Sequence, residues 1–237
     1  MDLRLCLTLV LLSGYDGAGP QAPSPAPPPG LAAATQPATT QASGESPLAA
    51  AAEKGDLERV RRLITDGAQL NPADADQSPL IGAVANRHRG VAEFLVLHGA
   101  HVNDCGRFGT ALHWAAATGD LALARFLIEH GAELAVRSRA EGTPLHSAAE
   151  ACNAEIVDLF IRDGANVNAK ANDGSTPLMW CIAQVRHDLR ARQVVRLLLD
   201  HGADVNVTDS HSNTPLGLAQ EAGDDDIIRM LAAHGAR

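Results

Sequence analysis

The sequence has few aromatic residues and few cationic side chains, and each shortage argues against a class of protein. Aromatic residues make up 3% of the 237 residues, although 46% of the chain is hydrophobic, which is enough to build a sizeable core. Nineteen lysines and arginines stand against 28 acidic residues, and the formal net charge of -9 at pH 7 leaves no basic footprint for nucleic acid. No run of 18 apolar residues is present, so no ordinary transmembrane helix is encoded.

Cysteine and catalytic motifs are also scarce. The chain has 4 cysteines, too few and too widely spaced for a disulfide scaffold or a zinc knuckle. It contains no nucleophile elbow, no glycine-rich phosphate loop and no His-Glu-x-x-His motif. Because no arrangement offers a nucleophile beside a base, we expect a protein that is not an enzyme, with no cofactor and no metal site.

Residues 1–14 have the shape of a secretory signal peptide, with Arg4 followed by an apolar run from Leu5 to Leu12 and then small residues. Tyr15 stands where a bacterial lipoprotein signal would have the acylated cysteine, so lipidation is not supported. We expect export to the periplasm or cell envelope, with membrane contact only through this segment. A cytoplasmic protein with a mis-called start is the alternative, because no Ala-x-Ala cleavage site follows.

Residues 15–45 differ completely in composition, with seven of the chain's 13 prolines and almost no large apolar residue. Such a segment cannot bury a core, so we expect a disordered linker. It would hold the rest of the chain near a membrane or display it away from one. A spacer with no further role is the alternative.

From residue 46 to residue 237 the chain repeats itself with a period near 33 residues. A Ser or Thr followed by Pro or Ala opens each of six units, because Ser or Thr caps a helix and Pro fits its first turn. A Gly-Ala pair closes each unit, because glycine adopts the left-handed conformation that ends a helix. The opening residues are Ser46, Ser78, Thr110, Thr143, Thr176 and Thr214, and the closing residues are Gly67, Gly99, Gly131, Gly164, Gly202 and Gly235.

Each unit predicts two helices, the first rich in small residues and the second in larger apolar ones. One unit alone leaves an apolar face open, and stacking of neighbouring units covers it. The predicted units span about 46–75, 76–105, 106–138, 139–170, 171–208 and 209–237.

The period, together with the Thr-Pro-Leu-His, Gly-Ala and Asp-Val-Asn motifs, resembles the ankyrin repeat. Repeat four reads GTPLHSAAEACNAEIVDLFIRDGANVN, and repeat five ends in LLLDHGADVN. The resemblance covers about 192 of the 237 residues, as six units. It implies an all-α solenoid of paired antiparallel helices, with hairpin-like fingers that form a concave surface with the first helices. It also implies a protein that binds other proteins.

The end repeats carry polar residues where inner repeats are apolar. The first has Arg59 and Arg62 in its second helix, and the last has Gln220, Asp225 and Ala232. Polar outer faces keep the ends of a solenoid soluble, so we expect the six repeats to form a complete array.

Two kinds of departure interrupt the pattern. Arg87 and Cys152 replace the usual glycine between the two helices of a repeat, so we expect these turns to be strained or differently shaped. Repeat five has five extra residues, within QVRHDLRARQ, which either lengthen a helix by about one turn or form a basic patch for an acidic partner. The basic residues of this insert are Arg186, His187, Arg190 and Arg192.

The ten histidines favour structural roles. His113 and His146 occupy the last position of Thr-Pro-Leu-His, where the resemblance implies hydrogen bonding within the repeat. Four others directly precede a closing glycine, where a helix C-terminus favours them electrostatically. These four are His98, His130, His201 and His234.

Trp114 and Trp180 occupy the same position of the first helix in repeats three and five, with Ser147 between them in repeat four. In the ankyrin family this position lines the concave face, so both are candidate partner-binding residues. The alternative for Trp114 is that it is a common filler of this position in the family. The remaining candidates are Arg107, Phe108, Arg137 and Arg139 on the fingers, and Arg190 in the insert.

The leading hypothesis is a non-catalytic module that binds a protein partner on its concave face, in the cell envelope. One alternative is an inhibitor or immunity-type protein that blocks an enzyme or toxin, because an anionic face suits a basic target. Another is an effector delivered to a host.

Overall fold

The computed structural model describes residues 46–138, 142–184 and 189–237. The signal-like segment 1–14 and the linker 15–45 lie outside these residues, so what we expect of them stays a prediction. Within the described chain, the first helices are α2 (Pro47–Glu53), α4 (Pro79–Ala85), α6 (Ala111–Thr118), α8 (Pro144–Glu150), α10 (Pro177–Ala183) and α12 (Pro215–Ala222). The second helices are α3 (Leu57–Thr65), α5 (Arg89–Leu97), α7 (Leu121–Glu129), α9 (Ala154–Arg162), α11 (Leu189–Asp200) and α13 (Asp225–Ala233), and a short 3-10 helix, η1 (Ala75–Gln77), precedes α4.

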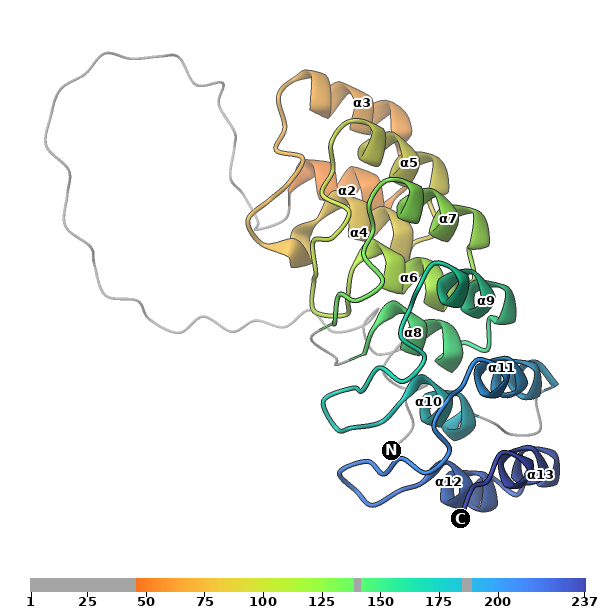
Figure 1. The fold of residues 1–237 in the computed structure, drawn as a ribbon. Helices are drawn as coiled ribbons and strands as arrows, with labels where there is room; N and C mark the ends of the chain where they lie inside the picture. Colours follow the sequence, from red (N-terminus) through yellow and green to blue (C-terminus); the bar gives the residue numbers. More distant parts are fainter. Residues whose placement is uncertain (1–45, 139–141, 185–188) are drawn as a thin grey trace, which may run out of the picture. The chain divides into compact units, whose positions relative to one another are not determined.

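The helix pairs stack into two rows (Figure 1). Each first helix packs against the first helix of the next repeat, from α2 to α12, and each second helix does the same, from α3 to α13. The loops that lead from one repeat to the next project beyond the row of first helices, and we call them fingers (Figure 1). The all-helical solenoid of stacked helix pairs predicted from the sequence is confirmed.

Side-chain size sets the spacing of the two rows. Ala115 and Ala148 on first helices are fully buried, and small side chains let neighbouring helices approach closely. The second helices fill the remaining space with larger side chains such as Leu127 and Phe160, both fully buried. The outward residues of the end repeats, among them Arg59 on α3 and Asp225 on α13, are exposed as predicted.

The first helices of repeats three and four begin with capping boxes that use the recurrent histidine. The backbone N–H groups of Thr110 and Thr143 each donate to the Nδ1 atom of His113 and His146, at 3.1 Å. Because Nδ1 accepts, Nε2 carries the proton and faces a carbonyl of the next finger, that of Gly142 for His113. The structural role predicted for both histidines is observed.

Two of the predicted caps are missing. Ser46 makes no side-chain capping bond, and the hydroxyl of Thr176 is buried without a hydrogen-bond partner. At the position of Met179, repeats three and four have the histidine whose Nδ1 lies 3.0 Å from the threonine hydroxyl, so that contact is missing at Thr176.

Residues with a left-handed backbone conformation follow the ends of the helices. At Gly131 the φ angle is +90°, and nothing lies within 4 Å of where a Cβ would stand, so the backbone conformation alone requires glycine. The turn between the two helices of a repeat is also left-handed, with φ of +69° at Gly223. Arg87 (φ +64°) and Cys152 (φ +55°) adopt this same conformation. Their turns therefore keep the usual shape and carry backbone strain of about 1–2 kcal/mol each.

The insert in repeat five lengthens a helix. Helix α11 has 12 residues, whereas α7 and α9 have 9 each, so the difference is about one turn. Arg186 and His187 lie outside the described residues.

Candidate partner-binding face

On every first helix the residue four positions after the opening Ser or Thr is partly exposed. We call these six positions the inner positions. They hold Ala50, Gly82, Trp114, Ser147, Trp180 and Leu218. All six are partly exposed, whereas the residues directly before and after each tryptophan are buried. The two tryptophans therefore share one face, on α6 and α10, with α8 between them.

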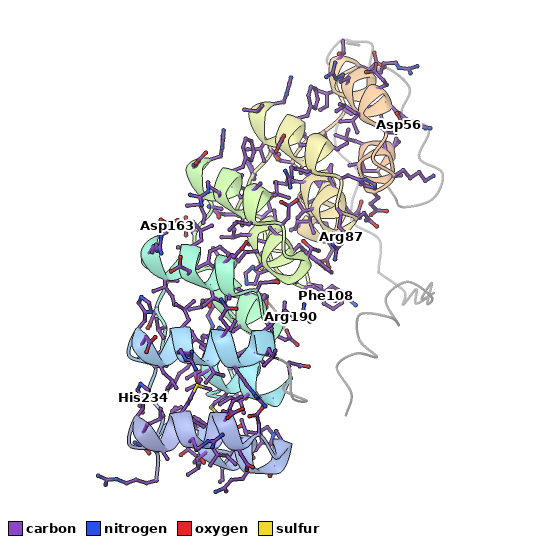
Figure 2. The ribbon with its side chains drawn as sticks, turned by 90° about the vertical axis from the view of Figure 1, so that its right-hand side faces the viewer. Asp56, Arg87, Phe108, Asp163, Arg190 and His234 are labelled. Atoms are coloured by element: carbon purple, nitrogen blue, oxygen red, sulfur yellow. The ribbon has the colours of Figure 1, made fainter. Side chains whose placement is uncertain are left out.

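Trp114 forms an aromatic pair with a finger. Its ring packs edge-on against Phe108, with the ring centroids 6.3 Å apart. Phe108 is 40% exposed, and Figure 2 shows it on the opposite edge of the domain from Asp163 and His234, which follow α9 and α13. The sequence candidates Trp114 and Phe108 are thus brought together, and the pair continues the face from helix to finger.

Trp180 is held in place by three neighbours. Its ring packs edge-on against His146, with centroids 5.0 Å apart, and its Nε1–H donates to the hydroxyl of Ser175 at 2.7 Å. A Cβ on Gly142 would come within 3.1 Å of the same ring. The side chain is therefore oriented by its own repeat and the preceding one while part of it stays accessible.

The candidate arginines have different surroundings. Arg107 is exposed on a finger, and its backbone N–H donates to Asp76 on the neighbouring finger. The guanidinium of Arg137 donates to the carbonyl of Lys170 at 2.7 Å and to Asn172 at 3.0 Å, so it connects two fingers. Arg137 therefore braces two neighbouring fingers, and its role in partner binding stays a prediction.

The other two arginine candidates are not placed on this face. Arg139 lies outside the described residues. Arg190 is exposed in the first turn of α11, which belongs to the row of second helices (Figure 1). Because the two tryptophans lie on first helices, the structure does not bring Arg190 into the row of inner positions.

Arg192 does not belong to a free basic patch. Its guanidinium donates to Asp224 at 3.0 Å and also pairs with Asp226, both in the next repeat. Asp224 is fully buried and caps α13 with its other oxygen. Arg89 makes the equivalent contact with Asp120, at 2.7 Å, between repeats two and three. Sequence analysis placed Arg192 in the basic insert, because Arg192 and Asp224 are 32 residues apart and no local pattern predicts that they pair.

Glu150 was not among the sequence candidates. It ends α8, three residues after Ser147, and is partly buried on the same side of the helix. Its Oε1 atom accepts from the side-chain amide of Gln184 at 3.4 Å, and burial raises the pKa of its carboxyl group. A comparison of the repeats gives only a weak signal, because Ala117 and Ala183 occupy the same position on α6 and α10 but Glu53 and Glu221 occupy it in the end repeats.

Burial dominates the electrostatics of the two capping histidines. It lowers the pKa of His113 and of His146 from 6.5 to about 4. A proton on Nδ1 would face the donors that Nδ1 now accepts from. Both rings are thus neutral structural elements at pH 7, with no part in acid–base chemistry.

Three residues on the last two fingers could face a metal ion. Asp173, Asp209 and His211 each offer one ligand atom, and these atoms lie within 4.8 Å of one another. Both carboxylates already accept hydrogen bonds that close the fingers, Asp173 from Ser175 and Asp209 from Asn213. These turn hydrogen bonds account for the acidic residues without an ion.

A family model for ankyrin repeats matches the chain in three copies, over residues 30–105, 100–171 and 165–237. The chain therefore belongs to the ankyrin-repeat family. Its described residues show no helix long and apolar enough to cross a membrane.

Individual relatives agree with this assignment. The chain is 37% identical to the Escherichia coli K12 ankyrin repeat protein YahD over 100 residues, which are 42% of this chain and 50% of YahD. It is 42% identical to human ankyrin repeat domain-containing protein 63 over 69 residues, which are 29% of this chain and 18% of that protein. The match thus spans half or less of these curated relatives.

Solved structures match over more of the chain. An ankyrin repeat domain from Acinetobacter baumannii AYE superposes with a TM-score of 0.71 at 32% identity, over 81% of this chain and 98% of that one. The ankyrin repeat domain of human ASB11 superposes with a TM-score of 0.70 at 27% identity, over 81% and 85%. Ankyrin repeats are generally protein-protein interaction modules and are typically not catalytic.

Proposed function

We propose that this protein is a non-catalytic module whose protein partner binds the face formed by the first helices and fingers, the concave face in the ankyrin family. The observation that carries the proposal is the placement of both tryptophans at inner positions, partly exposed, on α6 and α10. Tryptophan is prominent among the few residues that supply most of the binding energy in protein interfaces.

The test begins with affinity capture by the full chain and identification of the bound protein by mass spectrometry. We expect Trp180→Ala to weaken binding of that protein by at least about tenfold, or roughly 1.4 kcal/mol. Because the ring also contacts His146, the truncation should lower the melting temperature as well, so binding is measured well below the unfolding transition.

Trp180→Phe is the matched variant for this test, since it keeps an aromatic ring against His146. We expect its melting temperature to stay close to that of the natural protein while its affinity for the partner falls. Unchanged affinity in both Trp180→Ala and Trp114→Ala would contradict the proposal and move the search to Arg190 on α11.

We further propose that the protein acts in the periplasm or cell envelope, supported by the apolar run in residues 1–14 and the proline-rich segment behind it. Fractionation of cells that express the full chain with a C-terminal tag tests this location. An intact N-terminus, Met1 included, in the soluble cytoplasm would contradict it.

A second candidate function is inhibition of an enzyme or toxin, favoured by the formal net charge of -9, which suits a basic target. If the captured partner is an enzyme whose activity falls in proportion to the amount of complex, inhibition is supported. If its activity is unchanged in the complex, the protein is a passive adaptor.

A further inference from the structure

A recurrent asparagine joins one repeat to the next beside the C-terminal ends of the second helices. Asn103 donates through its side-chain amide to the carbonyl of Gly131 at 2.9 Å, and its side-chain oxygen accepts from the backbone N–H of Glu133 at 2.9 Å. We call this pair of hydrogen bonds the asparagine tie. The same tie is made by Asn71, Asn168 and Asn206.

The asparagine tie is missing between repeats three and four. Ala135 stands at the position of the asparagine, four residues after the closing Gly131. Among the described residues, no hydrogen bond reaches the two groups that an asparagine here would join, the carbonyl of Gly164 and the backbone N–H of Asn166. Both residues are exposed, so water can take the place of the tie without holding the repeats together.

A second tie joins the N-terminal ends of some second helices, and it too is missing at this junction. Arg89, the first residue of α5, pairs with Asp120, which caps α7, and Arg192 and Asp224 make the same contact between repeats five and six. Between repeats three and four, Leu121 and Asn153 occupy the two positions. Within the described chain, α7 and α9 are therefore the one pair of neighbouring second helices that neither tie joins.

The first helices keep their contacts at the same junction. The side-chain amide of Asn153 donates to the carbonyl of Ala116 on α6 at 2.7 Å, and Nε2 of His113 lies 3.1 Å from the carbonyl of Gly142. The two repeats are thus held along the row of first helices and are less constrained along the row of second helices.

A cleft marks the unconstrained side. It lies between α7 and α9, has a volume of about 320 Å³, and is lined in part by Leu121, Arg125 and Leu159 (Figure 1). No ion pair of the described residues crosses it, and Asp158 pairs instead with Arg162 of its own helix, at 2.8 Å.

We propose that the junction of repeats three and four is a hinge, at which α7 and α9 separate while α6 and α8 stay packed. The hinge divides the repeat domain into two blocks, with Trp114 in the first and Trp180 in the second. Its motion changes the spacing of the two tryptophans, so it adjusts the shape of the face that carries them. This inference goes beyond the proposed function, because it concerns the protein without a partner.

Spin labels at the last residues of second helices measure the opening. Leu97 and Arg162 end α5 and α9 and span the untied junction, whereas Thr65 and Glu129 end α3 and α7 and span two tied junctions. All four residues are exposed. Labels on a genetically encoded keto amino acid leave the 4 natural cysteines of the full chain unmodified. In pulsed electron paramagnetic resonance we expect a second population at longer distance for the first pair of labels and none for the second pair.

Ala135→Asn should restore the asparagine tie. Two added hydrogen bonds should lower the long-distance population of the first pair by about tenfold, or 1.4 kcal/mol, and leave the second pair unchanged. Ala135→Ser is the matched control, because its short side chain cannot make both hydrogen bonds, and it should keep the population.

Asn71→Ala tests the reverse change, since the asparagine tie is the only one of the two ties between repeats one and two. Its loss should create a long-distance population for the labels at Thr65 and Glu129. Equal distributions for the two pairs in the natural protein, or an unchanged first pair in Ala135→Asn, would refute the hinge. If Ala135→Asn does not fold, Asn71→Ala decides, and an unchanged second pair then rejects the proposal. These measurements need no partner, so failure of the hinge and failure of the proposed function are distinguishable.

Discussion

Acidification from pH 8 to pH 5 is expected to destabilise the repeat domain through two buried histidines. In the unfolded chain His113 and His146 take up protons near pH 6.5, whereas in the folded protein burial lowers their pKa to about 4. Between these two values the unfolded state binds more protons than the folded state, so the free energy of unfolding falls as pH falls. The contribution is fully present above pH 6.5 and is lost progressively down to pH 4.

The size of this effect follows from the two pKa values. At pH 5 an unfolded histidine with a pKa of 6.5 is almost fully protonated, while a folded one with a pKa of about 4 is mostly neutral. The linkage relation gives about 2 kcal/mol for each histidine, or about 4 kcal/mol for the pair. A change of that size is a large fraction of the stability of an ordinary domain, so it should be readily measured.

Urea unfolding followed by far-UV circular dichroism at pH 8, 7, 6 and 5 measures the loss. The comparison variant is His113→Gln with His146→Gln, whose amide oxygens can still accept from the threonine N–H groups. This variant should have a lower free energy of unfolding than the natural protein at pH 8. On acidification to pH 5, however, its free energy of unfolding should fall by about 4 kcal/mol less than that of the natural protein. Every other titratable group is the same in both proteins, so its contribution cancels. Equal losses in the two proteins would refute this reasoning.

Two further predictions concern stability measured by urea unfolding. Arg87→Gly should raise the free energy of unfolding by up to about 1 kcal/mol, because glycine relieves the strain at φ +64°. Gly223→Ala is its reverse, since nothing crowds a Cβ there, and should cost about 1 kcal/mol; no loss would show that φ is not the constraint. Met179→His should add about 1 kcal/mol by giving the buried hydroxyl of Thr176 a partner, and no gain would mean that the cap does not form.

The fold could be predicted almost entirely from the sequence because each helix boundary carries its own chemical mark. Ser or Thr with Pro opens a first helix, and Gly closes a second one, through interactions within a few residues of the chain. The exceptions were also visible, since Arg87 and Cys152 stand where the other repeats have a glycine, and the structure gives them the same positive φ.

The binding face was only partly accessible from the sequence, because its contacts join residues about one repeat apart. The shared position of Trp114 and Trp180 follows from the period alone. The orientation of Trp180 does not, because it depends on His146 of the preceding repeat. The pairing of Arg192 with Asp224 was hidden for the same reason, and a residue that looked available for a partner proved to hold two repeats together.

A repeat protein nevertheless contains its own comparison, because six copies of one unit show which residue a position needs for stacking alone. Seven residues after the opening Ser or Thr, three inner repeats have Ala85, Ala117 and Ala183, whereas repeat four has Glu150 and the two end repeats have the exposed Glu53 and Glu221. Packing does not require an acid there, since the alanines stack equally well. Within the part of the chain that the structure describes, the Glu150 carboxylate accepts from the side-chain amide of Gln184 in the next repeat at 3.4 Å, so this residue, like Arg192, makes its contact one repeat away, where no local pattern predicts it.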